Sequence, residues 1–357
     1  MLKKMNKVNP KISIIVPMYN CAEYAPKCIE SVQNQKYDNW ELLLIHGDSN
    51  DGTEAVCQSY EDKDSRIKNV FHIDGLVGAR NVGYEMAVGD WQMYIDGDDW
   101  IADNTLEELV AYINKYADVD VVFWKVIQDL NGKSIKGKWE WPCKDEERLY
   151  VGDECIDLAR NVLVYKSGIA TAYCKLIRSD YAKKNNIKHD DRLRQGMEGT
   201  EFSMRVFYNA KKVLYVNKYY NFYRYNPDSM SKTVSERNAH CITDCVKVME
   251  EDIDKYPQKE AFTKALYQRV TYALIAVAMS TYFHPDNHDS LLKKVKRYSD
   301  YINGYKFYRK AIMKTSTQGM GKQRTLVVWL LRMKLYIALS LIARLKAFYL
   351  KKGKFDY

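Results

Sequence analysis

The chain has few of the features that mark an exported or membrane-spanning protein. None of its eight cysteines forms a Cys-x-x-Cys pair, and their irregular spacing argues against a structural zinc site and against a disulfide framework. No run of about 18 uninterrupted apolar residues is present, so a spanning helix is not expected. The basic N-terminus leads into an apolar segment at residue 12 without the apolar core of a secretory signal. We therefore expect a cytoplasmic protein.

The sequence also lacks repeats and strong compositional bias. No short period and no self-similarity over about 20–50 residues is visible, which excludes collagen-like, coiled-coil and solenoid architectures. Apolar residues make up 46% and charged residues 28%, as in ordinary globular proteins, so wholesale disorder is excluded. A chain of 357 residues is long enough for about two domains.

Charge is distributed unevenly along the chain, whose formal net charge is +9. Residues 290–357 hold 17 Lys and Arg but only two acids, which gives this end a charge of +15. The first 289 residues hold 38 bases and 44 acids, a charge of −6. The sequence therefore joins a mildly acidic body to a strongly basic C-terminal end.

Strands and helices are expected to alternate over residues 12–126. Short apolar runs, typical of strands buried on both faces, occur at 12–16, 42–45, 70–73, 91–95 and 119–126. Helical patterns separate them at 22–34, 52–60, 77–87 and 106–116. This alternation predicts a doubly wound, mostly parallel α/β sheet, in which ligands bind at the carboxyl ends of the strands.

The rest of the chain is irregular at first and then helical. We expect a helix near 201–209 and strands at 212–216 and 219–225, followed by helices at 239–256, 260–282 and 290–301. Segment 325–350 is apolar, but its four charges do not share a face at about 100° per residue, so no clean amphipathic stripe is predicted. We expect one α/β domain over 1–230 and a helical region over 231–357.

Three carboxylates stand within four residues after the fourth expected strand. Residues 95–100 read Ile-Asp-Gly-Asp-Asp-Trp, with the acids at Asp96, Asp98 and Asp99. Like charges this close are costly unless a cation or hydrogen bonds compensate them. Magnesium or manganese can do so while also binding phosphate oxygens. A solvated acidic turn or a helix N-cap is the alternative, and the position at a strand end favours the metal.

Three motifs, in this order and spacing, resemble family 2 glycosyltransferases of the GT-A fold, of the bacterial surface-polysaccharide type. They are Ile-Ser-Ile-Ile-Val-Pro-Met-Tyr-Asn at 12–20, Ala-Arg-Asn-Val-Gly at 79–83 and the acidic motif at 95–100. The resemblance covers roughly residues 11–230. It implies a GT-A catalytic domain over 1–230, a nucleotide-sugar donor that is by default a uridine diphosphate sugar, and inverting transfer to a hydroxyl of a glycan or lipid-linked acceptor.

The resemblance also implies a metal site. Asp96 and Asp98 match the family's Asp-x-Asp motif, which binds the donor and its divalent cation, manganese or magnesium. In this family the second acid, here Asp98, is usually the metal contact that neutralises the diphosphate. Asp99 is expected to support it.

Donor contacts are implied at two further places. Pro17, Tyr19 and Asn20 match the loop around the nucleotide base, and Arg80 matches a residue near the diphosphate or ribose. The alternative for Arg80 is a charge on a helix surface. Because the family's asparagine and glycine follow it here, the donor contact is favoured.

One family element is altered. The usual Asp-Asp-Gly-Ser-x-Asp-Gly-Thr is replaced at 46–53 by His-Gly-Asp-Ser-Asn-Asp-Gly-Thr, so His46 and Gly47 stand where two base-reading acids are expected. Either Asp48 takes over that contact with the donor, or His46 contacts the base or ribose through its one donor and one acceptor. The identity of the nucleotide is therefore open.

Inverting transfer needs a carboxylate that removes the proton from the acceptor hydroxyl. By resemblance it lies at the second acid of a Gly-Glu-Asp-x-x-Phe-like helix start, which corresponds here to residues 195–204. Aligning Gly199 puts Thr200 at the first acid and makes Glu201 the candidate base, with Glu198 as the alternative. The alternative for Glu201 is a purely structural role, because an acid at the start of a helix is stabilised by the helix dipole.

Residues 223–226 and 229–231 resemble the family's closing loop. Arg224 would make charge-assisted contacts to the departing diphosphate, or else form a surface ion pair. Trp100 either lines an acceptor subsite or belongs to the core. The sequence does not separate these alternatives.

The basic end allows three interpretations. Nucleic-acid binding lacks a recognition motif and is disfavoured. An anionic membrane attracts each Lys or Arg near its surface by about 1 kcal/mol, so peripheral attachment at the inner face of the cell membrane, through the region from 290, is favoured. The alternative is a helical subdomain that packs 325–350 on the body and leaves Lys351, Lys352 and Lys354 solvated.

Two other function classes stay open at this point. A nucleotidyltransferase can use an acidic metal site on an α/β sheet, but it usually has a glycine-rich phosphate loop, and residues 17–21 contain no glycine. A non-catalytic sugar-binding or scaffold protein of the same fold is conceivable because of the altered segment at 46–47.

Overall fold

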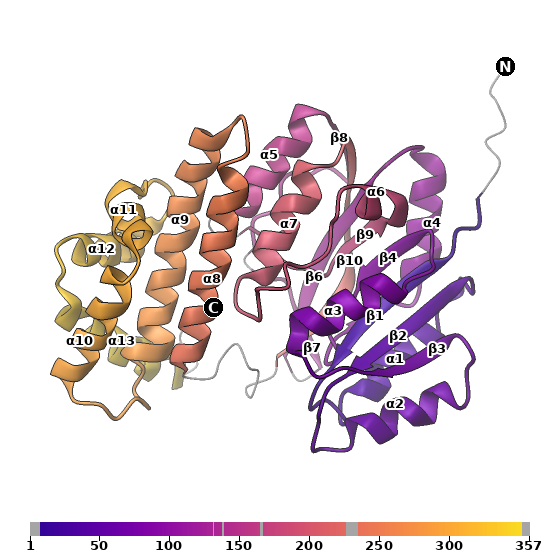
Figure 1. The fold of residues 1–357 in the computed structure, drawn as a ribbon, viewed down its shortest axis with the longest axis horizontal. Coiled ribbons are helices and arrows are strands. Elements are labelled where there is room, and N and C mark those ends of the chain that lie inside the picture. Colours follow the sequence, from indigo (N-terminus) through magenta and orange to yellow (C-terminus); the bar gives the residue numbers. More distant parts are fainter. Residues whose placement is uncertain (1–7, 131, 138, 165–166, 226–234, 352–357) are drawn as a thin grey trace. The chain divides into compact units, whose positions relative to one another are not determined.

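The computed structural model describes residues 8–130, 132–137, 139–164, 167–225 and 235–351 (Figure 1). The chain divides into two compact units. The first comprises Met1–Val162 and Ser167–Tyr225, and the second comprises Leu163–Lys166 and Asn226–Tyr357. The first unit is built on a β-sheet, and the described part of the second is helical.

The sheet of the first unit is mixed and mostly parallel around β1. Among the described residues its strands are β1 (Ile12–Met18), β2 (Trp40–His46), β3 (Ile67–Phe71), β4 (Trp91–Tyr94), β5 (Trp100–Ile101), β6 (Val121–Leu130), β7 (Lys133–Ile135), β8 (Glu147–Val151), β9 (Lys175–Arg178) and β10 (Lys212–Arg224). They lie in the order β3-β2-β1-β4-β9-β6-β10-β5, with β7 beside β6 and β8 beside β10. The predicted doubly wound sheet is confirmed.

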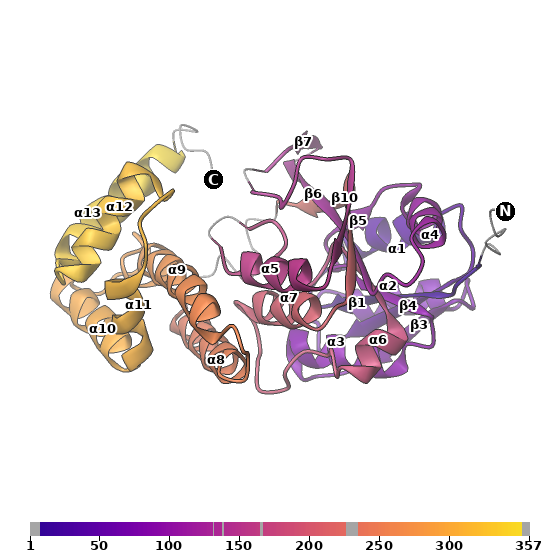
Figure 2. The same cartoon turned by 90° about the horizontal axis from the view of Figure 1, so that it is seen from above.

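Helices cover both faces of this sheet. They are α1 (Ala25–Gln33), α2 (Thr53–Glu61), α3 (Gly75–Met86), α4 (Thr105–Lys115), α5 (Asp153–Val162), α6 (Ser179–Lys184) and α7 (Glu198–Tyr208). Figure 2 shows α1 and α4 on one face and α3, α6 and α7 on the other. Because both faces are covered, β1 and β2 are apolar and buried over nearly their whole length, as parallel strands are.

Helix α3 packs unusually close to β1. A Cβ on Gly83 would lie 2.2 Å from Cγ2 of Ile15, so a side chain at this position cannot be accommodated without movement of the helix. The glycine of the Ala-Arg-Asn-Val-Gly motif therefore has a packing role. It brings the preceding turn of α3, which carries Arg80, down onto the sheet.

The middle of the sheet differs from the expected pattern. β9, which the pattern along the chain did not predict, runs antiparallel to both β4 and β6. The two strands expected at 212–216 and 219–225 form one strand, β10, with shifts of register against β6 between Tyr215 and Asn221. Asp120 joins these strands, because its carboxylate accepts bonds from Arg178 and from the backbone N–H groups of residues 211 and 212.

The second unit consists of helices in its described part. They are α8 (Glu236–Ile253), α9 (Lys259–Val277), the π-helix η2 (Ala278–Tyr282), α10 (Leu291–Asn303), α11 (Lys306–Lys314), α12 (Gly321–Arg332) and α13 (Tyr336–Lys351). Buried tyrosines form its centre: the hydroxyl of Tyr301 donates to the carbonyl of Ala239 (2.7 Å), and that of Tyr308 to Oγ1 of Thr243 (2.6 Å). No helix in the described part of the chain has the length and apolarity needed to cross a bilayer.

Segment 325–350 is not continuous, contrary to the expectation of one helical segment. α12 ends at Arg332, and α13 begins at Tyr336. Between them Lys334 has φ of 58°, a left-handed conformation that interrupts an α-helix. The break changes the phase of the two helices, so their faces must be considered separately.

Candidate active site

The predicted donor loop and the acidic motif meet at the carboxyl ends of β1 and β4. A Cβ on Gly97 would lie 2.7 Å from Sδ of Met18 and 2.9 Å from the carbonyl oxygen of Pro17. Only a glycine allows so close an approach without movement of its neighbours. The acidic turn after β4 is therefore packed directly on the end of β1.

Arg80 joins two carboxylates that are far apart in the sequence. Its Nη2 lies 2.9 Å from Oδ1 of Asp96, and its Nη1 lies 3.1 Å from Oε1 of Glu198. The arginine side chain is only 3% exposed. Burial by itself lowers its pKa, but the charges and hydrogen bonds of Asp96 and Glu198 outweigh that effect and raise it, so the guanidinium stays charged. Arg80 is thus not the surface charge considered as the alternative.

The other two carboxylates of the acidic motif belong to a turn held by Arg224. The backbone N–H of Arg224 donates to Oδ1 of Asp99 (2.9 Å), and its Nε donates to the carbonyl of Asp98 (2.9 Å). Asp99 is buried, and burial together with the charges of Asp98 and Asp96 raises its pKa well above the ordinary value. A cation bound at this turn would relieve that repulsion.

Two cations and two aromatic rings lie beside this turn. The guanidinium carbon of Arg224 lies 4.7 Å from the ring centre of Tyr24 and 5.0 Å from that of Trp100. Nζ of Lys27 lies 3.2 Å from the Trp100 ring centre, and burial followed by repulsion from Arg224 lowers the lysine pKa. Trp100 also stacks on Phe222 at 5.2 Å and is buried, which favours a packing role for it. Lys27 was not among the predicted site residues.

The donor loop after β1 is fastened to the loop after β2. Asn20 has φ of 46°, its N–H donates to Oγ of Ser49 (3.1 Å), and its Oδ1 accepts from the N–H of Asn50 (3.2 Å). Tyr19 is 53% exposed. It lies beside Gly47, since a Cβ added to Gly47 would be 3.4 Å from Cδ2 of the Tyr19 ring. Tyr19 thus presents an open aromatic surface, while Asn20 shapes the loop.

The two residues predicted to contact the nucleotide base from the altered segment, His46 and Asp48, differ in exposure. His46 is the last residue of β2, is 2% exposed and packs with its ring centre 5.4 Å from that of Phe71. Asp48 is exposed, two residues farther along the loop. The burial of His46 therefore favours a packing role, and the exposure of Asp48 leaves it able to contact a ligand.

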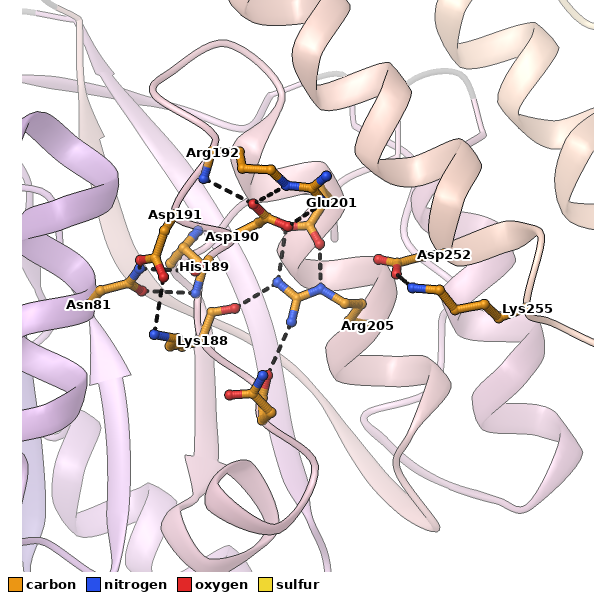
Figure 3. Close-up of polar contacts among 11 residues, drawn as sticks. Asn81, Lys188, His189, Asp190, Asp191, Arg192, Glu201, Arg205, Asp252 and Lys255 are labelled. Carbon is orange, nitrogen blue, oxygen red and sulfur yellow. Dashed lines mark hydrogen bonds and ion pairs between the residues drawn. The ribbon is translucent and has the colours of Figure 1, made fainter.

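The two glutamates at the start of α7 have different surroundings. Glu198 is the first residue of the helix, with a side chain 12% exposed, and it pairs with Arg80. Glu201 is 0% exposed and pairs with Arg205 four residues on, through Nε and through Nη2 at 3.0 Å. Arg205 also donates to the carbonyl of Lys188 (2.6 Å). Figure 3 shows Glu201 facing Arg205, with Lys188 on the far side of the guanidinium.

Asn81, next to Arg80 in α3, fixes the segment that leads into α7. Its Oδ1 accepts from the N–H of His189 (2.9 Å), and its Nδ2 donates to the carbonyl of the same residue (2.9 Å) and to Oδ1 of Asp191 (2.6 Å) (Figure 3). The imidazole of His189 is buried against Phe202, with ring centres 4.3 Å apart. Burial, then the charges of two arginines, lowers its pKa well below the ordinary value, so it stays neutral. We refer to these contacts of Asn81 as the Asn81 clamp.

A hollow of about 290 Å³ borders the clamp. Its lining includes His72, Asp74 and Gly78, which follow β3, together with Asn81 and Asp191. A Cβ on Gly78 would lie 2.6 Å from Nε2 of His72, so the loop after β3 packs closely on α3. Another hollow, of about 390 Å³, contains none of the predicted site residues and is lined by Tyr112, Lys115, Glu146, Glu147, Asn217 and Lys218.

The carboxylates of the acidic turn would suit an open site for a divalent cation. No group of three or more His, Cys, Asp and Glu side chains within residues 8–351, apart from the gaps given above, could enclose a metal ion. Asp98 and Asp96 supply hard oxygen atoms from one turn, and Asp96 is already paired with Arg80. Magnesium and manganese usually take only one or two protein carboxylates and complete their shell with water and phosphate oxygens. The donor set is therefore suited to such a cation.

Arg224, predicted either to contact the departing diphosphate or to form a surface ion pair, lies against the acidic turn. The neighbouring segment 229–231, which resembles part of a closing loop, lies outside the described residues. Lys27 and Arg205 are additions that the motifs did not identify, and Asn81, although it belongs to the motif at 79–83, was not assigned a contact of its own. The i,i+4 spacing of Glu201 and Arg205 is a sequence signal for their pairing, whereas nothing in the sequence indicates the contact between Asn81 and His189.

Comparison with known proteins agrees with this arrangement. The profile described as Glycosyl transferase family 2 matches residues 13–184. An uncharacterised glycosyltransferase of Haemophilus influenzae is 38% identical over 184 residues, which are 51% of this chain and 69% of that protein. The GalNAc(5)-diNAcBac-PP-undecaprenol beta-1,3-glucosyltransferase of Campylobacter jejuni is 26% identical over 260 residues, 70% of this chain and 78% of that protein. Against other bacterial relatives the match spans 34%, 63% and 62% of their length.

The fold is shared with a solved structure. S. aureus TarS 1-349 in complex with UDP-GlcNAc superposes with a TM-score of 0.66 at 16% identity, covering 97% of this chain and 93% of that chain. This likeness confirms the GT-A type of sheet followed by a helical region. The sequence match to the Haemophilus protein and the match to the family profile show that the chain belongs to glycosyltransferase family 2.

Proposed function

We propose that this protein transfers a sugar from a nucleotide-diphosphate donor, by default a uridine diphosphate sugar, to a hydroxyl of a glycan or lipid-linked acceptor, with inversion. One observation carries the proposal: the guanidinium of Arg80 holds Asp96 of the acidic turn and Glu198 of α7 at 2.9 and 3.1 Å. A metal-binding turn and a candidate base thereby share one site. The names of two similar proteins, one bound to UDP-GlcNAc and one acting on an undecaprenol-linked glycan, support the donor and acceptor classes.

We propose Glu198 rather than Glu201 as the catalytic base. A base must reach the acceptor hydroxyl, and Glu201 is fully buried with its carboxylate occupied by Arg205. Separating that pair would leave a charge buried without compensation, which is costly. Glu198 keeps partial exposure beside the acidic turn and has only one oxygen assigned to Arg80.

The residues of the site then have distinct roles. Glu198 takes the proton of the acceptor hydroxyl as that oxygen attacks the anomeric carbon, and the donor carbon–oxygen bond to the diphosphate breaks on the opposite face. Arg80 positions Glu198 and Asp96. A divalent cation bound by Asp98 and Asp96 would supply positive charge to the leaving diphosphate. Arg224 and Lys27 add further positive charge beside the turn.

Recognition of the nucleotide is assigned to the loops after β1 and β2. Pro17 and Asn20 shape the first loop, Tyr19 offers an exposed ring for stacking on the base, and Asp48 offers an exposed carboxylate. The buried His46 acts through packing rather than by direct contact with the base. Attachment of the region from residue 290 to an anionic membrane is a separate proposal, because it depends on residues outside this site.

A panel of nucleotide sugars tests the proposed activity. The purified chain is incubated with uridine, guanosine and thymidine diphosphate sugars, with manganese, magnesium or chelator, and release of nucleoside diphosphate is measured. We expect release from one nucleotide class, strongest with the metal present, and loss of it in Asp98→Asn. Release of pyrophosphate would indicate a nucleotidyltransferase instead, and silence across the panel would indicate a non-catalytic protein.

A further inference from the structure

An apolar surface remains open on the last two described helices. Six apolar side chains are each between 52% and 62% exposed: Leu326 and Trp329 of α12, Met333 directly after it, and Ile337, Leu341 and Leu345 of α13. Side chains of this size cost free energy when water surrounds them, and large contiguous patches mark interaction sites. We call these six residues the apolar belt.

The spacing of the belt residues places them on one side of each helix. On α12 they follow i, i+3 and i+7, and on α13 they follow i, i+4 and i+8, which are the positions of a single helix face. The turn between the helices continues the belt, because Leu335 is exposed there as well. The sequence pattern did not reveal this surface, because the four charges of segment 325–350 do not share one face of a helix.

The opposite faces of both helices are apolar too. Val328 and Leu331 of α12 and Leu339 of α13 are 0% exposed within the second unit. A helix that is hydrophobic all round is normally buried on every side. The outer faces of α12 and α13 therefore lack the covering that their composition calls for, at least among the residues the structure describes.

Charge identifies what covers the belt. Residues 301–355 contain 13 Lys and Arg and no acid. Two of these bases serve the fold: Arg309 donates to the carbonyls that end α12, and Arg332 donates to those of Ile312 and Thr315 at the end of α11. Others, including Lys322, Lys334 and Arg344, are exposed on or next to the belt helices.

We propose that the apolar belt inserts into the surface of an anionic membrane, with these bases against the lipid headgroups. A second copy of the chain would place one basic surface against another, which is repulsive, whereas an anionic lipid surface attracts each base and receives the apolar side chains. Trp329 is suited to the interface, where tryptophan is enriched. The proposal concerns the second unit alone and is independent of the choice of base in the first.

Flotation with lipid vesicles tests the belt. The full chain is mixed with vesicles of phosphatidylcholine alone or of phosphatidylcholine and phosphatidylglycerol. The wild type should float with the anionic vesicles and only weakly with the neutral ones. The double variant Trp329→Glu/Leu341→Glu should partition at least about tenfold less, and high salt should weaken wild-type binding without abolishing it.

A control places one glutamate at another site of the same unit, which is half the charge change of the double variant. Leu292→Glu alters a side chain that is 77% exposed on α10 of the same unit, outside the belt, and it should partition like the wild type. Thermal unfolding of all three proteins shows whether each is folded. Equal binding by the double variant and the wild type, or equal loss in Leu292→Glu, would overturn the belt. A wild type that ignores vesicles but forms a dimer, which the double variant converts to monomer, would assign the surface to a second copy instead.

Discussion

Two glutamate–arginine pairs at the start of α7 consist of the same residue types but differ in their surroundings and roles. Glu198 shares Arg80 with Asp96, a residue 102 positions earlier in the chain, and retains partial exposure. Glu201, one helical turn on, is closed off by Arg205 of the same helix, which also donates to backbone carbonyls at 186 and 188. We refer to them as the Arg80 pair and the Arg205 pair.

The two pairs differ in which parts of the unit each arginine connects. Taking an ion pair out of water is favourable only when all of its polar atoms find partners. Arg205 meets that condition locally, so the Arg205 pair behaves as a structural contact between α7 and the segment before it. Arg80 draws together the acidic turn and the start of α7, which are 102 residues apart in the chain, so the Arg80 pair assembles a site.

The largest expected effect on stability comes from breaking the Arg205 pair. Glu201→Gln removes the fully buried carboxylate charge that faces Arg205, and we expect the free energy of unfolding to fall by about 3–5 kcal/mol. The double variant Glu201→Gln/Arg205→Met should recover part of that loss, because it removes the uncompensated charge. Denaturant unfolding measures both. A single variant as stable as the wild type would show that the Arg205 pair contributes little.

A smaller loss of stability is expected from removing the Asn81 clamp, which lies next to Arg80 in α3. Asn81→Ala leaves the buried N–H and carbonyl of His189 without their partners, which should lower the free energy of unfolding by about 1–3 kcal/mol. Asn209→Ala removes an exposed amide at the end of α7 and serves as the control, with a change of less than about 1 kcal/mol. The Asn81 clamp is contradicted if the two variants unfold alike.

Lys175 extends the comparison to a buried lysine whose ammonium group contacts backbone carbonyls. Its ammonium group donates to the carbonyls of Thr171 and Tyr173, it is 1% exposed, and burial lowers its pKa from 10.5 to about 7, with the neighbouring Cys174 opposing. Above that folded pKa the unfolded chain binds more protons than the folded one. Stability should therefore rise from about pH 7 toward pH 9, by up to about 1.4 kcal/mol per pH unit.

The variant Lys175→Met isolates this contribution. It keeps a stem of similar length and removes the titrating group, so the rise of unfolding free energy with pH should become shallower. Denaturant unfolding at several pH values gives the two slopes. Identical slopes in variant and wild type would mean that Lys175 does not titrate in this range.

The sequence predicted those parts of the fold that depend on local pattern. Buried parallel strands such as β1 can be recognised in the sequence as apolar runs, and the acidic motif follows β4 as expected. β9 was missed because this four-residue strand is defined by its pairing with β4 and β6, and a local sequence pattern does not encode that pairing. The apolar belt was missed because the four charges of segment 325–350 are spread around the helix, and the exposure of the apolar side chains depends on packing.

The site was predictable in its parts more than in its connections. Motif spacing led to Asp96, Asp98 and Arg80 but not to the pairing of Arg80 with Glu198, 118 residues apart. The ranking of Glu201 above Glu198 came from alignment by a glycine, whereas burial decides which glutamate can reach a ligand. Burial depends on the packing of α7 against the whole unit.

The most direct measurement compares turnover in Glu198→Gln and Glu201→Gln, with donor affinity and thermal unfolding recorded for each. If Glu198 is the base, Glu198→Gln should lower turnover by about 10²–10⁴-fold with donor affinity close to the wild type. Its loss of stability should be smaller than that of Glu201→Gln, because Arg80 keeps its pair with Asp96. Glu201→Gln should unfold at a lower temperature yet keep most of its turnover while folded. Wild-type turnover in Glu198→Gln, with loss confined to a folded Glu201→Gln, would contradict the assignment and restore Glu201 as the base.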